Sequence, residues 1–148
     1  MEPNKEKIIT VSAGTGRFCI RGIGIPTDGN GLIVCILGGE VSHVGAVAIG
    51  IPRAGLRYTE GRSATSSVFT LVGHMDDEVA KPASWRIAQE LNQATVVVAG
   101  IHLESEPAYH TSESDLKTII ANTKEVTDKL IAEFKKQAAS TAQKTATH

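Results

Sequence analysis

The sequence contains few aromatic residues, few cysteines and almost no net charge, and each of these features argues against certain classes of protein. Aromatic residues make up 4% of the 148 residues, which argues against a broad surface for stacking nucleic-acid bases. The net charge of −1 at pH 7 lacks the basic excess of nucleic-acid-binding proteins. No apolar run reaches the length of a membrane span, and residues 1–7 lack the apolar core of a signal peptide. We therefore expect a cytoplasmic protein that binds neither nucleic acid nor a membrane.

Cysteine is scarce as well, since the chain holds only Cys19 and Cys35. Both lie in apolar, strand-like runs, and they do not form a CxxC pair. This pattern predicts two reduced, buried thiols that pack as small hydrophobic residues. A disulfide between neighbouring strands is the alternative, although it would be unusual in the cytoplasm.

The chain does have a series of short apolar segments, within a composition of 41% hydrophobic and 21% charged residues that is ordinary for a globular domain. Strands are predicted over 8–11, 17–25, 32–37, 44–51, 68–71 and 95–101. The run 32–37 is apolar throughout, so we expect both of its faces to be covered. The Asp28-Gly29 pair that precedes it favours a hairpin.

Two helices are predicted from periodicity. The first, over 76–92, has an apolar residue at every fourth position: Val79, Ala83, Ile87 and Leu91. Pro82 either belongs to the first turn of a helix that begins near Lys81 or follows a short opening turn. The second helix begins with a Ser-x-x-Asp pattern at Ser112 and runs to about Gln137.

Short links between the early strands indicate antiparallel pairing. The fold class that we expect is α+β, a two-layer sandwich in which a mainly antiparallel meander sheet carries two helices packed on one face. Residues 1–137 form a single domain, and residues 138–148, rich in Ala, Thr and Gln, form a frayed or disordered tail. No glycine fingerprint lies between the first strand and a helix, which argues against a Rossmann fold.

Three histidines stand next to the ends of predicted strands. His74 follows one strand, His102 ends another, and His43 precedes a third. We expect His74 and His102 to converge on a common cavity, because ligands bind at strand ends in α/β-type proteins. Three imidazoles can bind zinc or copper, but their spacing matches no metal motif, and we assign no metal site. Asp76 and Asp77 follow His74, and a helix's first turn by itself accounts for both carboxylates.

A polar loop is predicted over 52–62, and it carries Arg53, Arg57 and Arg62. Guanidinium groups match the oxygens of a phosphate, so this loop is a candidate phosphate site. The hydroxyl-rich run 63–67 would add further donors. The alternative is an exposed, charged loop before an ordinary strand. The chain has no Gly-x-Ser-x-Gly motif, which argues against acyl-transfer catalysis.

Taken in order, these segments resemble the prenylated-flavin chaperone (LpdD-like) family, which accompanies UbiD-type aromatic acid decarboxylases. The resemblance spans roughly residues 8–130. The matching motifs are Gly38-Gly39-Glu40, His43-Val44-Gly45-Ala46-Val47-Ala48, Pro52-Arg53, Ser63-Ala64-Thr65-Ser66-Ser67, Gly73-His74-Met75-Asp76-Asp77-Glu78-Val79-Ala80-Lys81-Pro82, Val96-Val97-Val98-Ala99-Gly100-Ile101-His102 and Asn122. Where the family is expected to have a basic residue after Gly-His, this chain has Met75.

The resemblance implies a non-catalytic protein that binds prenylated flavin mononucleotide, or flavin mononucleotide, as cargo and delivers it to a UbiD-type decarboxylase. It implies no catalytic residues. The residues assigned to cofactor binding are His43, Arg53, Ser63, Thr65, Ser66, His74, Asp77 and His102. Because a flavin ring is large for a domain of this size, we expect a pocket shared between two copies in a homodimer.

Two other functions fit the same residues. One is a metal-dependent enzyme built on the three histidines, with Asp77 or Glu78 as general base. The other is a structural subunit or assembly chaperone of a decarboxylase complex, in which Trp85 and the long C-terminal helix hold the partner.

Overall fold

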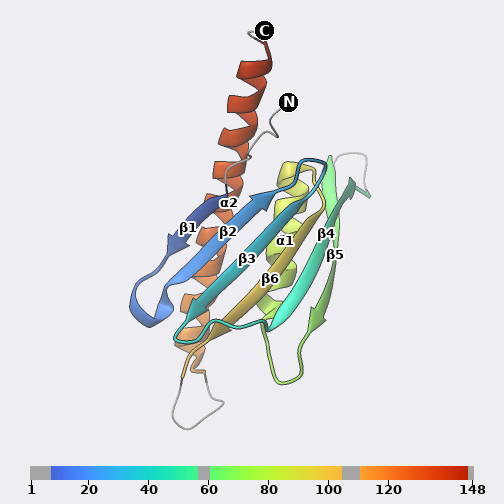
Figure 1. Ribbon diagram of the computed structural model, residues 1–148. Helices are drawn as coiled ribbons and strands as arrows, with labels where there is room; N and C mark the ends of the chain where they lie inside the picture. Colours follow the sequence, from blue (N-terminus) through green and yellow to red (C-terminus); the bar gives the residue numbers. More distant parts are fainter. Residues whose placement is uncertain (1–7, 57–60, 105–110, 147–148) are drawn as a thin grey trace.

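The computed structural model describes residues 8–56, 61–104 and 111–146 of the chain. These residues form six strands, a short 3-10 turn and two α-helices (Figure 1). The strands are β1 (Ile9–Ala13), β2 (Ile20–Pro26), β3 (Leu32–Gly39), β4 (Ala46–Ala54), β5 (Arg62–Thr70) and β6 (Thr95–His102). The helices are η1 (Gly16–Phe18), α1 (Asp77–Leu91) and α2 (Glu113–Ala146).

One sheet contains all six strands, in the order β1-β2-β3-β6-β4-β5. Every neighbouring pair is antiparallel except β3 and β6, which run parallel. The predicted α+β class and mainly antiparallel sheet are therefore confirmed. The meander is interrupted, however, because β6, the last of the six strands in the sequence, inserts between β3 and β4 and becomes a central strand.

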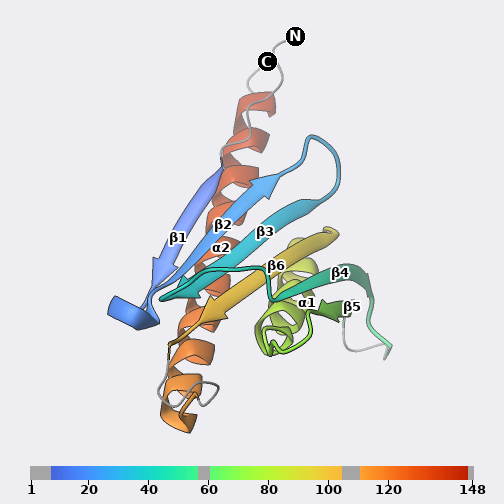
Figure 2. The same cartoon turned by 60° about the horizontal axis from the view of Figure 1, so that its bottom comes forward.

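Both helices cover the same face of the sheet, as predicted (Figures 1 and 2). Along β3, Leu32, Val34 and Ile36 point toward the helices and are buried, whereas Ile33 between them is 42% exposed. Only one face of this apolar run is covered, so the prediction that both faces would be covered was wrong. We call the face that the helices leave uncovered the open face.

The two glycines of β2 let α2 approach the sheet closely. A Cβ atom at Gly22 would lie 2.5 Å from Val126 Cγ1, and one at Gly24 would lie 2.5 Å from a ring carbon of Phe134. Larger side chains at these positions would push the helix away from the strand. The glycines in this strand thus serve helix packing.

Helix α1 begins at Asp77, so Pro82 lies inside the helix, after the opening turn. Its predicted core stripe is confirmed, with Val79, Ala83 and Ile87 buried against the sheet. The helix ends where Asn92 adopts a left-handed conformation with φ of 55°.

Helix α2 starts as predicted, because the Ser112 hydroxyl accepts a hydrogen bond from the backbone N–H of Asp115 at 3.1 Å. It ends later than predicted. The helix continues beyond Gln137 to Ala146, and every residue in 138–146 is exposed. Neither described helix is long and apolar enough to cross a membrane.

Cys19 and Cys35 are both free thiols. The prediction that they are buried was wrong, since Cys19 is exposed and Cys35 is only partly buried. The register explains Cys35, because it alternates with the buried residues of β3 and therefore faces the open side of the sheet.

Candidate functional site

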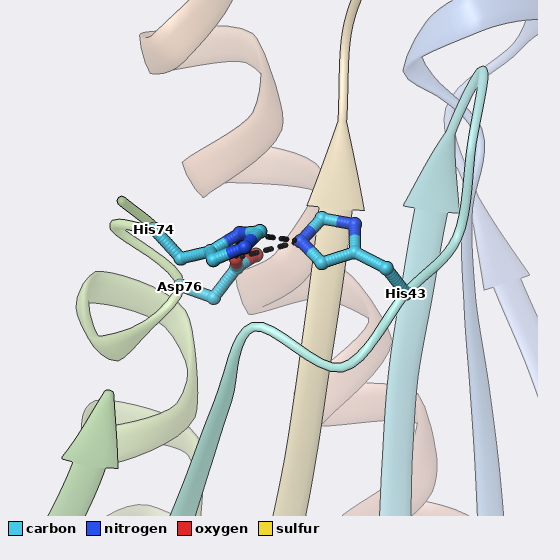
Figure 3. Close-up of side chains that lie close together, drawn as sticks. All are labelled: His43, His74 and Asp76. Carbon is cyan, nitrogen blue, oxygen red and sulfur yellow. Dashed lines mark hydrogen bonds and ion pairs between the residues drawn. The ribbon is translucent and has the colours of Figure 1, made fainter. Parts of the chain in front are cut away.

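Polar side chains gather at one end of the sheet, where the connection from β3 to β4, the turn between β5 and α1 and the end of β6 meet. His43 lies in the connection from β3 to β4, and His74 and Asp76 lie in the turn between β5 and α1 (Figure 3). His43 Nε2 is 2.9 Å from His74 Nδ1 and 3.2 Å from Asp76 Oδ2. His74 Nδ1 is 3.7 Å from the same carboxylate oxygen. We refer to these three residues as the His-Asp cluster.

Asp76 is the buried member of the cluster, with 7% of its side chain exposed. Its Oδ1 atom accepts a hydrogen bond from the backbone N–H of Ile101 at 2.8 Å. Strand β4 stops pairing with β6 at Ala46 and Ala99, so beyond that pair the carboxylate takes the place of a strand partner. This bond fixes Oδ1 on the sheet and turns Oδ2 toward the histidines.

Two glycines make room for the cluster. A Cβ atom at Gly45 would collide with Asp76 Oδ2, and one at Gly100 would collide with the backbone carbonyl of His43. The connection from β3 to β4 therefore passes directly over β6, and this crossing brings His43 within reach of Asp76. Larger side chains at either position would separate the segments.

His102, at the end of β6, lies beside the cluster. Its ring is edge-on to the His43 ring, with 6.0 Å between the centroids, and the rings of His43 and His74 are 4.6 Å apart. The three histidines that the sequence singled out thus lie together at the strand ends. Sequence reasoning missed the part that Asp76 plays.

From its position in the sequence, Asp76 was interpreted as a residue at the start of a helix that bonds to the free N–H groups there. Its side chain makes no such capping hydrogen bond. It bonds instead to the backbone of Ile101 in β6 and to His43. The available signal was its position two residues after His74, which allows both side chains to reach the same place. Asp77, the first residue of α1, is only partly buried and follows the cluster directly.

The residues of the predicted phosphate site lie mainly in two strands and not in a loop. Arg53 belongs to strand β4 and Arg62 opens β5, so the prediction of a polar loop over 52–62 was wrong at both ends, and Arg57 lies outside the described residues. Arg53 Nε donates a hydrogen bond to Thr65 Oγ1 at 3.1 Å, and Arg53 is paired with Ser63 across the two strands.

The hydroxyl run 63–67 forms part of β5, so its side chains alternate between the two faces of the sheet. Ser63 and Thr65 share the open face with Arg53. Ser66 points the other way, and its Oγ lies 2.6 Å from Ser84 Oγ in α1. The run therefore does not form a single row of phosphate donors.

The predicted site residues fall into two groups at opposite ends of β4. Strand β4 begins at Ala46, close to the His-Asp cluster, and Arg53 is seven residues further along it. At about 3.3 Å per residue, that separation is about 23 Å. One protomer thus holds the histidines and the Arg53 group far apart.

The described part of the protein also has two hollows. One, of about 570 Å³, is lined by residues of β1, β2 and β3, by Cys19 just before β2, and by the connection that leads to His43; the lining includes Thr10, Ser12, Arg21, Leu37 and Ser42. The other, of about 550 Å³, lies between α1 and α2 and is almost entirely apolar; it is lined by Ser66, Val79, Pro82, Trp85, Ile120 and Thr127, among others. Trp85, 38% exposed, forms part of this wall, and its ring N–H donates to the carbonyl of Ala64 at 2.9 Å.

A small α+β domain with polar side chains gathered at its strand ends, next to a hollow, is typical of proteins that bind a small molecule. Comparison with known families matches residues 14–135 to the prenylated flavin chaperone LpdD-like domain. The match covers most of the chain, which therefore belongs to this family. Comparison with curated proteins found no similar protein.

Proposed function

We propose that this protein is a non-catalytic chaperone that binds prenylated flavin mononucleotide and delivers it to a UbiD-type decarboxylase. The observation that carries the proposal is membership of the prenylated flavin chaperone family over residues 14–135. The shape of the site agrees with a carrier role. The cluster is partly exposed, with 21% of the His43 side chain and 34% of the His74 side chain accessible, so a ligand can reach it from solvent in a single protomer.

We assign the cargo to the hollow over β1, β2 and β3, whose lining reaches Ser42, the residue before His43. Its wall contains one arginine, several hydroxyl groups and the apolar side chain of Leu37, and Ser42 in its lining precedes His43 directly. A guanidinium group recognises phosphate, and hydroxyls suit a ribityl chain. In this arrangement His43, His74 and His102 face the ring or the ribityl chain, and Asp77 stays a predicted contact at the margin.

Arg21, rather than Arg53, is the arginine that we assign to the cargo phosphate within one protomer, because Arg53 lies about seven residues of β4 away from the cluster. Arg53, Ser63 and Thr65 reach the cargo only from a second copy. Ser66 is removed from the proposed contacts, since it bonds to Ser84 toward the helices.

The second copy would cover the open face. Large apolar side chains are exposed there, namely Ile25, Ile33, Ile49, Ile51 and Phe69. Six strands spaced about 4.8 Å apart and about 25 Å long present roughly 700 Å². Stable interfaces bury about 800 Å² per partner, and homodimer interfaces are the more apolar ones, so a face-to-face homodimer fits this surface in both size and chemistry.

The test of the proposed function is transfer of cofactor in the absence of oxygen. The full chain is titrated with reduced prenylated flavin mononucleotide and with reduced flavin mononucleotide, and binding is followed by fluorescence and calorimetry. The loaded protein is then mixed with an apo-decarboxylase of the UbiD type. We expect saturable binding and faster activation than free cofactor gives at the same concentration; no binding of either flavin would refute the proposal.

The phosphate assignment has its own test. Arg21→Ala should weaken the binding of flavin mononucleotide by about tenfold or more, since hydrogen bonds to a charged group contribute about 1.5–3 kcal/mol. The binding of riboflavin, which lacks the phosphate, should stay nearly unchanged. The control is Arg86→Ala in the helix layer, where Arg86 pairs with Asp128. Equal losses for the two flavins with Arg21→Ala would contradict the assignment.

A further inference from the structure

We propose that His43, His74 and Asp76 form a binding site for a divalent transition-metal ion of the Zn²⁺ type. The three facing atoms are His43 Nε2, His74 Nδ1 and Asp76 Oδ2, and all lie within 4.8 Å of one another. Two imidazoles and one carboxylate are ordinary ligands for zinc in proteins. This inference goes beyond the proposed function, because neither flavin binding nor delivery requires a metal, and it does not depend on that function.

The spacing of the three atoms fits a tetrahedral ion. Their separations are 2.9 Å, 3.2 Å and 3.7 Å (Figure 3). Ligand atoms about 2.0–2.1 Å from a tetrahedral zinc ion lie about 3.3 Å from one another. The three separations lie around this value, so an ion can bind all three atoms with shifts of a few tenths of an ångström.

The protons of the cluster also favour a cation. The carbonyl oxygen of Val41 lies 3.4 Å from His43 Nδ1; in the tautomer of His43 that donates to this oxygen, the lone pair of Nε2 points into the cluster. Asp76 Oδ2 is an acceptor as well. In that tautomer, His43 Nε2 and Asp76 Oδ2 are both acceptors, and His74 Nδ1 can offer them only one proton. A metal ion would bind the lone pairs of all three atoms at once.

Groups outside the cluster hold two of the ligands in place. The Val41 carbonyl faces His43 Nδ1, and the Ile101 N–H orients the Asp76 carboxylate. Protein metal sites commonly have such outer partners, which fix ring orientation and ligand basicity. Asp76 is 7% exposed, so this carboxylate is positioned before any ion arrives.

The fourth coordination position is open. His43 and His74 are 21% and 34% exposed, and the three protein ligands leave room for one more. Three protein ligands plus an exchangeable one are typical of sites that bind an external molecule, whereas structural zinc sites have four protein ligands. An oxygen anion such as a phosphate is the class of ligand that suits this position.

The experiment uses the full chain, purified without a metal-affinity tag and treated with a chelator. Zn²⁺ is titrated calorimetrically against a competing chelator. We expect one ion per chain, with binding weakened more than about tenfold by His43→Ala, His74→Ala or Asp76→Asn, since loss of an outer partner alone costs 10–100-fold. Glu78→Gln, which removes a neighbouring exposed carboxylate, is the matched control and should bind like the original protein. Circular dichroism confirms that each variant is folded.

Saturating Zn²⁺ without stoichiometric binding would overturn the proposal, and so would binding that survives in the His43→Ala/His74→Ala double variant. His74 is the most exposed ligand, so His74→Ala keeps the test valid if the other variants misfold. Substitution with Co²⁺ tests the geometry: we expect the intense visible absorption of a tetrahedral site and a change in that spectrum on adding inorganic phosphate. An unchanged spectrum would refute the open position. Flavin binding measured in the presence of the chelator keeps this result separate from the chaperone role.

Discussion

The backbone N–H of Ile101 donates a hydrogen bond of 2.8 Å to the Asp76 carboxylate. The carboxylate thus serves as the partner of β6 beyond the point where β4 stops pairing with it. The bond connects the start of α1 to the central strand β6. It also determines which oxygen of Asp76 faces the histidines. The stability of the sheet end and the shape of the His-Asp cluster therefore depend on the same side chain.

Replacing Asp76 by alanine should destabilise the fold by about 1–3 kcal/mol, because the Ile101 N–H loses its acceptor. Asp76→Asn keeps an oxygen for that bond and should cost less. Urea unfolding followed by circular dichroism measures both. Asp77→Asn, at the next position, is the control and should cost less than about 1 kcal/mol, because it loses only the favourable interaction of a carboxylate with the start of the helix. An Asp76→Ala variant as stable as this control would show that the bond contributes little.

A methyl group at Gly45 should disturb the cluster, since it would collide with Asp76 Oδ2. We expect Gly45→Ala to cost about 1–3 kcal/mol, the usual penalty for overpacking. Gly29→Ala is the matched substitution, because a Cβ atom there meets nothing within 4 Å. Thermal unfolding compares the stabilities of the two variants. Equal midpoints would mean that the segment around Gly45 shifts to accommodate the methyl group at little cost.

Gly24 and Phe134 should be energetically coupled across the sheet and α2. Gly24→Ala brings a methyl group to 2.5 Å from the Phe134 ring and should destabilise by about 1–3 kcal/mol. In a Phe134→Leu background the added methyl has more room, so the cost should fall. A double-mutant cycle measured by chemical denaturation gives the coupling, which should exceed about 0.5 kcal/mol. Strictly additive effects would argue against this contact.

The proposed homodimer can be tested on the open face. Phe69 is 84% exposed, and its partner across the strands is Val47. Phe69→Asp should shift the protein toward monomer, because a buried, unpaired carboxylate would cost several kcal/mol in the interface. Light scattering with size-exclusion chromatography gives the mass. Val72→Asp is the control, since Val72 is fully exposed in the turn after β5. If the original protein is already monomeric at high concentration, the dimer proposal fails.

Local patterns predicted most of the secondary structure. The four-residue spacing of Val79, Ala83 and Ile87 located α1, and the Ser112 motif located the start of α2. These features depend on residues that are close in the chain. The position of β6 does not, because which strands pair with it depends on contacts between distant segments. The predicted meander was therefore correct for the hairpins β1-β2, β2-β3 and β4-β5, but it lacked the insertion of β6 between β3 and β4.

The setting of Arg53 was missed for a related reason. Pro52 suggested a loop, since proline cannot donate a hydrogen bond to a neighbouring strand. In the structure β6 pairs with β4 only as far as Gly50, so Pro52 pairs on one side alone and is tolerated within the strand. The role of Asp76 was hidden too, because its partner Ile101 is distant in sequence.

The insertion of β6 has a consequence for how the protein becomes competent during synthesis. His43, His74 and Asp76 all emerge before Thr95, yet the Ile101 amide that orients Asp76 and the strand crossed by the His43 segment emerge later. A nascent chain that has not reached residue 101 holds every facing atom of the cluster without the framework that aligns them. The cluster would thus bind a ligand only after β6 has paired with β3 and β4.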